Sequence, residues 1–345
     1  MARDAERPPL AVTMGEPAGI GGEIALAAWR ARNAKAVPQF FLFDDPIRLR
    51  ALIKQLDWQI EIREIAAPDE VHAVFPDAVP VLPIDLPAPV TPGRIDPANS
   101  AKVVESIREA VAIVQAGEAR ALVTNPIQKS TLYDAGFSHP GHTEFLATLA
   151  GATQAPVMML ACPELRVVPV TVHLPLRDAV AALRREDIIH CATVTAEALT
   201  RDFGIAPPRL SVAGLNPHAG ENGSLGREEK DIIAPAVEAL KSRGLAIDGP
   251  HPADTMFHPR ARAGFDAAIC MYHDQALIPL KTIDFDRGVN ITLGLPFVRT
   301  SPDHGTALAI AGKGIANPAS MIEALTAADR MSVRRAARAS ATAGG

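Results

Sequence analysis

Cysteine is scarce in this chain, and long apolar runs are missing from it. Only three of the 345 residues are cysteines (Cys162, Cys191 and Cys270), and they are far apart, form no CxxC pair and lie in apolar stretches. Reduced, buried thiols are therefore expected, and a disulfide framework or zinc–thiolate site is not. No apolar run approaches the about 18 residues that span a bilayer, and the segment MARDAERPPL lacks the apolar core of a signal peptide. We expect a cytoplasmic protein without membrane association.

Blocks of basic residues are also absent. Charged residues make up 21% of the chain, and the formal net charge is −5. This balance argues against a nucleic-acid-binding or membrane-surface protein. An anionic metabolite could still bind, but only through a local group of cations, so we expect the function to reside in a focused pocket.

Familiar local signatures of metal or dinucleotide binding are missing as well. No HExxH motif occurs, and the glycine-rich segment GEPAGIGGE has the spacing GxxxGxG, which does not match GxGxxG. A strand-to-helix turn of this kind often serves close packing, so it is a weak candidate for a cofactor site.

The patterning that is present predicts an α/β protein. Hydrophobic residues make up 48% of the chain, and apolar strand-like runs alternate with helical patterns throughout. The segment SAKVVESIREAVAIVQAG predicts a helix with Ser100 as N-cap, ended by Gly117. The proline-rich segment 79–97 predicts an extended connector or a sheet edge. Mostly parallel sheets with helices on both faces are expected.

Histidines follow three of the predicted strands. They are His173 in VTVHLPL, His218 in GLNPHAG and His273 in MYHDQ. Because ligands bind beyond the carboxyl ends of parallel strands, these side chains should converge, and three neutral imidazoles can hold a divalent cation. For any single one of them, a loop histidine that caps the backbone is the competing interpretation. The similar setting of all three favours the metal site.

Further polar residues suit an anionic substrate. His142 and Thr143 lie at a predicted helix start, where free amides favour phosphate or carboxylate, although Thr143 could equally be an ordinary N-cap. Lys281, Asn290 and Arg299 interrupt an apolar segment and could bind phosphate and carboxylate, or could be surface residues paired with nearby aspartates. Asp254 and Asp274 are candidate outer ligands, imidazole orienters or general bases, and turn caps otherwise.

Together these segments resemble the PdxA family, the 4-hydroxythreonine-4-phosphate dehydrogenases of vitamin B6 biosynthesis. The resemblance runs nearly end to end, through GEPAGIGGE, VTNPIQK, GHTEFLA, HLPLRD, LNPHAGENGSLGREE, GPHPADTMF, YHDQALIPLKT and NITLGLPFVRTSPDHGTA. It implies an isocitrate/isopropylmalate dehydrogenase-like fold, with two α/β/α domains of mostly parallel sheets and a cleft between them. We expect residues 1–130 plus 300–345 to form the cofactor-side domain, and residues 131–299 the metal and substrate domain with the dimer interface.

The resemblance also implies roles for individual residues. The metal ligands would be His173, His218 and His273, with Zn, Mg or Co as the ion. The substrate-binding residues would be His142, Thr143, Lys281, Asn290 and Arg299. We assign Asp274, Asp254 and Lys281 to catalysis, and His304, Gly305, Thr306 and Asn222 to binding of NAD or NADP. Homodimers with the active site at the subunit interface are expected.

The implied reaction is the oxidation of 4-phosphooxy-L-threonine to 2-amino-3-oxo-4-phosphooxybutanoate, which loses carbon dioxide to give 3-amino-2-oxopropyl phosphate. A sibling activity on D-threonate or D-erythronate 4-phosphate is the main alternative, and a phosphate acyltransferase of similar architecture is a weaker one. The chain departs from the common family pattern at Glu16, Gly22 and Asn125, and at Ala309 from that of the wider superfamily.

Overall fold

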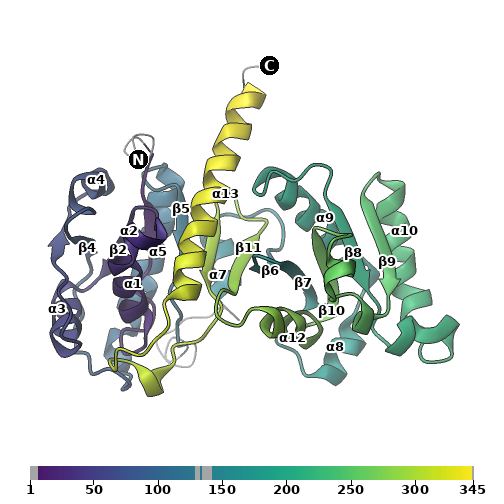
Figure 1. The fold of residues 1–345 in the computed structure, drawn as a ribbon, viewed down its shortest axis with the longest axis horizontal. Helices are drawn as coiled ribbons and strands as arrows, with labels where there is room; N and C mark the ends of the chain where they lie inside the picture. The colour runs from purple at the N-terminus through teal and green to yellow at the C-terminus, as the bar shows by residue number, and fades with distance from the viewer. Residues whose placement is uncertain (1–6, 129–132, 134–141, 344–345) are drawn as a thin grey trace. The chain divides into compact units, whose positions relative to one another are not determined.

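The computed structural model describes residues 7–128, 133 and 142–343, apart from the side chains of His142, Thr342 and Ala343. The chain divides into two compact units. Unit 1 consists of Met1–Pro156 and Leu295–Val333, and unit 2 of Val157–Gly294 and Arg334–Gly345. Both units combine strands with helices (Figure 1). The roles predicted for the two domains, and their boundaries, stay predictions.

All the described strand pairs in the sheet of unit 1 are parallel. Its strand order is β3-β4-β2-β1-β5-β12. The strands are β1 (Leu10–Val12), β2 (Phe40–Asp44), β3 (Ile62–Glu64), β4 (Val79–Pro83), β5 (Ala121–Val123) and β12 (Arg299–Pro302). Residues of β1, β2 and β5 are fully or almost fully buried, which requires cover on both faces of the sheet.

Helices of unit 1 follow its strands in the order expected for parallel connections. They are α1 (Gly21–Arg30), α2 (Arg32–Lys35), α3 (Pro46–Gln55), α4 (Val71–Val74), α5 (Ser100–Ala116), α7 (His142–Leu149) and most of α13 (Ala319–Ala343), with 3-10 turns η1 (Pro68–Glu70), η2 (Pro97–Asn99) and η6 (Leu308–Ile310). Helix α5 packs on β1, β2 and β5 through its buried side, which includes Val103, Ile107 and Val111.

The sheet of unit 2 is mixed. Its order is β11-β6-β7-β10-β8-β9, in which β11–β6 and β6–β7 pair antiparallel and the other pairs are parallel. The strands are β6 (Val157–Cys162), β7 (Leu165–Thr171), β8 (Arg209–Ala213), β9 (Ala246–His251), β10 (Ala267–Tyr272) and β11 (Val289–Leu293). The three central parallel strands β7, β10 and β8 therefore end at one edge.

The helices of unit 2 are α8 (Leu176–Ala182), α9 (Arg185–Arg201), α10 (Ala234–Ser242), α11 (Pro259–Arg262) and α12 (His273–Ile283), with short turns η3 (Pro217–Gly223), η4 (Glu229–Ile233) and η5 (Ala253–Thr255). Alternate strand residues build the core under α12. Val167, Ala268 and Cys270 pack with Ala276 and Leu280 of that helix. Successive side chains of a strand point to opposite faces of the sheet, so every second residue of β10 faces α12.

The predicted α/β class is confirmed, with two local corrections. Helix α5 begins at Ser100 itself, and the residue before it is Asn99, which ends the turn η2 and provides no side-chain cap. Gly117 ends the helix with φ 80°, as predicted. The proline-rich segment 79–97 is predicted to be an extended connector or a sheet edge, yet its first residues form β4, an internal strand that pairs with both β2 and β3.

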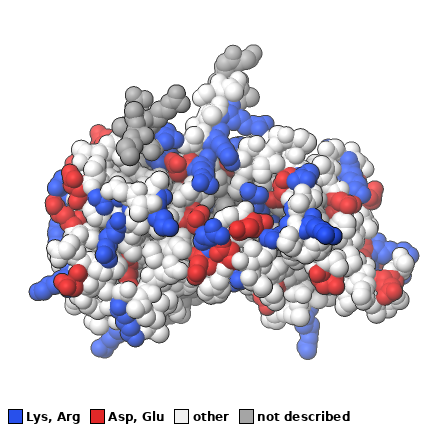
Figure 2. Space-filling view, in the orientation of Figure 1, with Lys and Arg blue, Asp and Glu red and all other residues white. Residues whose placement is uncertain are grey.

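The surface and the thiols agree with the composition. All three cysteines are reduced and buried. Within the described residues, no helix combines the length and apolarity needed to cross a membrane. Positive and negative side chains are intermixed on the visible face (Figure 2), so no extended field of one sign covers that face.

Candidate active site

The three histidines predicted to bind a metal all follow neighbouring strands of unit 2. His173 lies two residues beyond β7, His273 directly follows β10, and His218 lies five residues beyond β8. Strand β10 pairs in parallel with both β7 and β8. The carboxyl ends of these strands therefore place all three residues at one edge of the sheet, which is where ligands bind in such folds.

Two of these histidines lie side by side. The ring centroids of His173 and His273 are 6.1 Å apart, with an angle of 43° between the ring planes. Asp274 Oδ1 lies 2.7 Å from His273 Nδ1, so the carboxylate can accept a hydrogen bond from Nδ1–H. The other ring nitrogen, Nε2, then remains available to bind a metal ion. This contact favours the role of imidazole orienter among the roles considered for Asp274.

His218 belongs to a loop with an unusual backbone. It has φ 52° and begins a run of positive φ angles that continues to Gly223, and His173 also has a positive φ, of 50°. Such conformations are uncommon for non-glycine residues and gather at functional sites. Among the residues that the structure describes, no three His, Cys, Asp or Glu side chains of one chain are close enough to hold a metal ion.

The donor chemistry of this edge nevertheless suits a divalent cation. Imidazole nitrogens are ligands for zinc and cobalt, and here two of them are adjacent while a third leaves the neighbouring strand. The described part of one chain therefore provides two adjacent imidazoles, but not three ligands placed together around one ion. Asp254, in η5, and Asp274 are both exposed. Among the described residues, neither of them forms a group of three possible metal ligands with the histidines.

Lys281 and Asn290 both belong to unit 2. Lys281 lies near the end of α12, and its Nζ is 5.4 Å from the ring centroid of Phe285. Asn290 lies on β11, and its Oδ1 is buried without a hydrogen-bond partner in the described structure. A buried acceptor without a donor is costly, so a ligand that donates a hydrogen bond would stabilise this position.

Arg299 and Thr143 belong to unit 1. Arg299 begins β12 and is 4% exposed, and it donates from Nε and Nη2 to Thr124 Oγ1 at 3.1 and 2.6 Å. Burial lowers the pKa of the Arg299 guanidinium to about 10, so the group stays protonated at neutral pH. A buried guanidinium is a group that can bind an anionic ligand. Thr143 lies in the first turn of α7 as predicted, and the side chain of His142 is outside the described residues.

The predicted cofactor residues are divided between the units. His304, Gly305 and Thr306 precede η6 in unit 1, and Asn222 ends the left-handed run in unit 2. The carbonyl of Thr306 accepts from the Ile20 amide at 3.0 Å, which ties this loop to the start of α1. Gly305 is exposed, and a Cβ atom placed on it would meet nothing within 4 Å.

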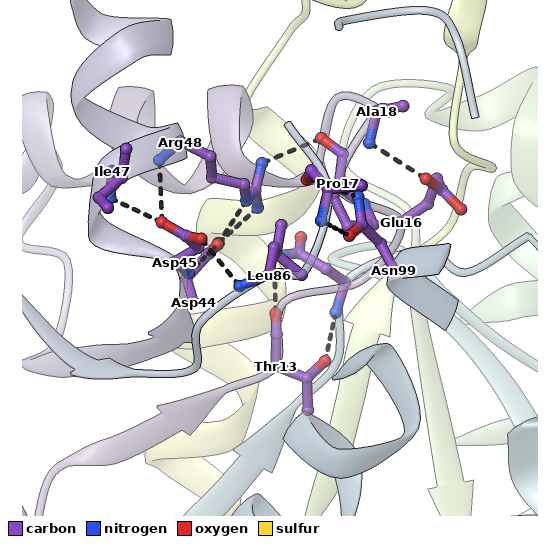
Figure 3. A network of polar contacts seen from close by, with 12 residues as sticks. Thr13, Glu16, Pro17, Ala18, Asp44, Asp45, Ile47, Arg48, Leu86 and Asn99 are labelled. Atoms are coloured by element: carbon purple, nitrogen blue, oxygen red, sulfur yellow. Dashed lines mark hydrogen bonds and ion pairs between the residues drawn. The ribbon is translucent and has the colours of Figure 1, made fainter. Parts of the chain in front are cut away.

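The glycine-rich loop between β1 and α1 is used for packing, as its spacing indicated. Cβ atoms at Gly15 and Gly19 would lie 2.5 Å from Asn125 Cβ and 2.9 Å from the Thr306 carbonyl oxygen. Arg48 forms a buried ion pair with Asp44 and donates from Nη1 to the Pro17 carbonyl at 3.0 Å (Figure 3). The loop is therefore held from both sides by protein groups.

Two of the unusual residues in the sequence lie beside this loop. Burial raises the pKa of Glu16, although the Ala18 amide and Arg48 oppose the shift. Asn125 donates from Nδ2 to the Thr13 carbonyl at 3.0 Å and is 2% exposed. The larger amide thus occupies the space against which Gly15 packs.

Sequence reasoning missed several residues that support the site. They are Thr124 against Arg299, Asp44 with Arg48, and the pair Glu229 and Gln275 near His218 and His273. Neither Glu229, in the charged segment REEKD, nor Gln275, which follows His273 and Asp274, differs in the sequence from an ordinary surface residue. Which partners they have is set by tertiary structure.

Solved structures with the same fold are enzymes of the α/β class. A 4-hydroxythreonine-4-phosphate dehydrogenase from Klebsiella pneumoniae has a TM-score of 0.85 and 38% identity, over 94% of this chain and 99% of that one. A branched-chain phosphotransacylase from Enterococcus faecalis, with 12% identity and a TM-score of 0.56, shares the fold alone.

The family follows from the sequence comparison. The model of the family described as "Pyridoxal phosphate biosynthetic protein PdxA" matches residues 36–328, and the chain belongs to this family. A 4-hydroxythreonine-4-phosphate dehydrogenase from Bradyrhizobium diazoefficiens is 53% identical over 338 residues, covering 95% of this chain and 98% of that protein. One from Caulobacter vibrioides is 52% identical over 332 residues, with coverage of 95% and 98%.

Proposed function

We propose that this chain is a 4-hydroxythreonine-4-phosphate dehydrogenase that uses NAD or NADP and a divalent metal ion. It would oxidise 4-phosphooxy-L-threonine to 2-amino-3-oxo-4-phosphooxybutanoate, which loses carbon dioxide to give 3-amino-2-oxopropyl phosphate. The observation that carries the proposal is identity of 53% over almost the whole chain with a protein of that name. The adjacent rings of His173 and His273 support it from the structure.

The metal would be bound by His173, His218 and His273, with zinc, cobalt or magnesium as the ion. Bound there, it would lower the pKa of the substrate hydroxyl and withdraw electrons during the loss of carbon dioxide. Asp274 orients His273 through the 2.7 Å contact with Nδ1. Asp254 and Lys281 remain our candidates for the group that accepts the hydroxyl proton.

The anionic ends of the substrate would be bound by cations and amides. Arg299 offers a buried guanidinium, and Asn290 a buried carbonyl oxygen that can accept from a hydroxyl or ammonium group. Lys281, His142 and Thr143 complete the proposed set. Binding energy from the remote phosphate would position the reacting carbon for hydride transfer.

The nicotinamide cofactor would bind along His304, Gly305 and Thr306, with Asn222 as a further contact. The absence of a side chain at Gly305 leaves open space in which a ligand can approach the backbone closely. The cofactor would supply the hydride acceptor, and Asp254 or Lys281 would accept the hydroxyl proton. We place this reaction in the cytoplasm.

A second copy of the chain would complete the site. Large apolar side chains are exposed on the segments that carry the three histidines: Leu174, Leu176, Val180, Leu225, Ile278 and Phe285. Exposed apolar side chains gathered in one region are typical of interfaces between subunits. A partner covering these segments would bury the histidines and could supply further ligands, which suits the partial set found in one chain.

Reduction of NAD with 4-phosphooxy-L-threonine, followed at the nicotinamide absorbance, tests the proposal. Turnover that a chelator abolishes and a divalent cation restores is the expected result. Activity with D-threonate or D-erythronate 4-phosphate instead would keep the chemistry and change the substrate. Absence of turnover with all three, at saturating NAD or NADP and with metal added, would overturn the proposed function.

A further inference from the structure

The loop that carries His218 adopts a conformation that its own residues do not favour. From His218 to Asn222 the φ angles are 52°, 51°, 75°, 42° and 57°, and only the middle residue, Gly220, is a glycine. L-residues enter this left-handed region as single residues and avoid runs of it. Contacts from outside the run must therefore hold the loop in place.

A buried carboxylate provides those contacts. Glu229 is 5% exposed, and its Oε1 accepts from the backbone amides of Leu215 and Asn216 at 2.8 and 2.7 Å. Its Oε2 accepts from Asn216 Nδ2 at 2.9 Å. A Cβ atom at Gly220 would lie 2.5 Å from the same Oε2, so the left-handed run packs directly against this side chain.

The base of the loop is also joined to the segment that carries His273. Gln275 is buried, two residues after His273, and its Oε1 accepts from the Met271 amide at 2.6 Å. Its Nε2 donates to the Gly214 carbonyl at 2.7 Å, directly before Leu215. Gln275 therefore holds one end of the loop base to the His273 segment, and Glu229 holds the next two residues.

We propose that Glu229 is a positioning residue for the metal ligand His218. Its carboxylate binds the loop base and supports the left-handed run, so that His218 is held at the sheet edge from which His173 and His273 also emerge before the metal arrives. The inference rests on the proposed function, because it assigns His218 to the metal. Residues that orient a ligand without touching the metal commonly affect metal affinity about 10–100-fold.

Variants of Glu229 test this role through metal binding in the absence of substrate. Glu229→Gln keeps the shape but places an amide NH2 donor opposite the donor Asn216 Nδ2, and Glu229→Ala removes both acceptors. Asp231→Asn is the matched control, because Asp231 lies in the same turn, is exposed and pairs with Arg227. The measurements are Co²⁺ titration by calorimetry, the visible spectrum of the Co²⁺ protein, and the unfolding midpoint of the metal-free protein.

We expect Co²⁺ affinity to fall about 10-fold or more in Glu229→Ala and less in Glu229→Gln, with an altered spectrum and an unchanged control. Saturating Co²⁺ should restore most of kcat in Glu229→Gln. The inference would be overturned if both variants bound Co²⁺ within twofold of the affinity of the unsubstituted protein and had the same visible spectrum as that protein. If Glu229→Ala does not fold, Glu229→Gln decides by the same criterion.

His218→Ala separates this inference from the proposed function. Loss of Co²⁺ binding in His218→Ala, together with normal binding in the Glu229 variants, would refute the positioning role alone. Normal Co²⁺ binding in His218→Ala would refute the metal assignment itself.

Discussion

The imidazole rings of His173 and His273 lie 6.1 Å apart because the strands before them are in register. Thr171, the last residue of β7, is paired with Tyr272, the last residue of β10. The two histidines therefore leave the sheet at the same height from adjacent strands. No local sequence motif joins them, and the pairing depends on the parallel ladder alone.

Removing either histidine should abolish metal retention. Since each would supply one of three nitrogen ligands, His173→Ala or His273→Ala should lower metal affinity by more than the about 10–100-fold expected for an outer partner. Elemental analysis after dialysis measures the bound metal, and the unfolding midpoint shows that the fold is intact. His190→Ala, on α9, is the control. A variant that keeps stoichiometric metal would remove that residue from the proposed ligands.

Arg299 should matter for the substrate more than for the cofactor. Arg299→Lys keeps a positive charge but loses the planar fork, so we expect KM for the phosphorylated substrate to rise about 10-fold or more. KM for NAD should change little. Arg120→Lys, which lies in the same unit and pairs with Asp329, serves as the control. Equal changes in both KM values would contradict the substrate role.

Gly305 allows a test of the cofactor loop in which the fold is not disturbed. A methyl group there meets no protein atom within 4 Å, so Gly305→Ala should leave the unfolding midpoint unchanged. If the dinucleotide approaches this backbone, KM for NAD should rise several-fold while KM for the substrate stays constant. Unchanged kinetics would place the cofactor elsewhere.

The exposed apolar side chains of unit 2 should mediate self-association. Ile278 is 64% exposed on α12. If the protein forms the proposed dimer, Ile278→Asp should make it monomeric at micromolar concentration and lower turnover. Ile47→Asp, at a position 73% exposed in unit 1, is the matched control. Sedimentation velocity gives the oligomeric state. A stable dimer of Ile278→Asp would exclude this residue from the interface.

Asp202 should make unit 2 sensitive to acid. Burial alone would raise the pKa of Asp202, but hydrogen bonds from Arg335 and Arg201 outweigh it and lower the pKa below 3.8. The stabilisation is therefore complete above about pH 4 and is lost as pH falls through the lowered pKa.

Asp202→Asn should consequently reduce the free energy of unfolding by about 2 kcal/mol at pH 7, with a smaller difference below pH 4. Denaturant unfolding at both pH values measures it. Asp231→Asn, at an exposed pair, should change stability little. A difference between the Asp202 variant and the unsubstituted protein that is independent of pH would show that the carboxylate charge is not involved.

Much of the architecture was predictable from the sequence because its signals are local. Alternation of strands and helices gave the α/β class, and Gly117 marked the end of α5. Strand order was not predictable, since it depends on which edges meet. The proline-rich strand β4 is an example. Val79 donates to the Glu61 carbonyl and Val81 accepts from the Ile65 amide, so the contacts towards β3 are made by the residues on either side of Pro80. An internal strand can therefore contain it.

The residues of the candidate site were also predictable only in part. The position of histidines after apolar runs predicted the edge at which His173, His218 and His273 lie. The residues that hold them could not be predicted, because Glu229 and Gln275 act through backbone groups of distant segments. Because every residue has a backbone amide and carbonyl, the identity of a residue does not indicate that its backbone binds a particular side chain. The left-handed run after Pro217 was equally hidden, since only one of its five residues is a glycine.

The buried cysteines have a practical consequence for work on this protein. Burial raises the pKa of Cys162, Cys191 and Cys270, that of Cys191 to about 12, so their thiols stay protonated and covered at neutral pH. Because the thiolate is the reactive form, reagents such as maleimides should modify them slowly. A cysteine introduced at an exposed position, for example by Ile47→Cys, would then be labelled selectively. Spectroscopic probes can be attached without first removing the native thiols.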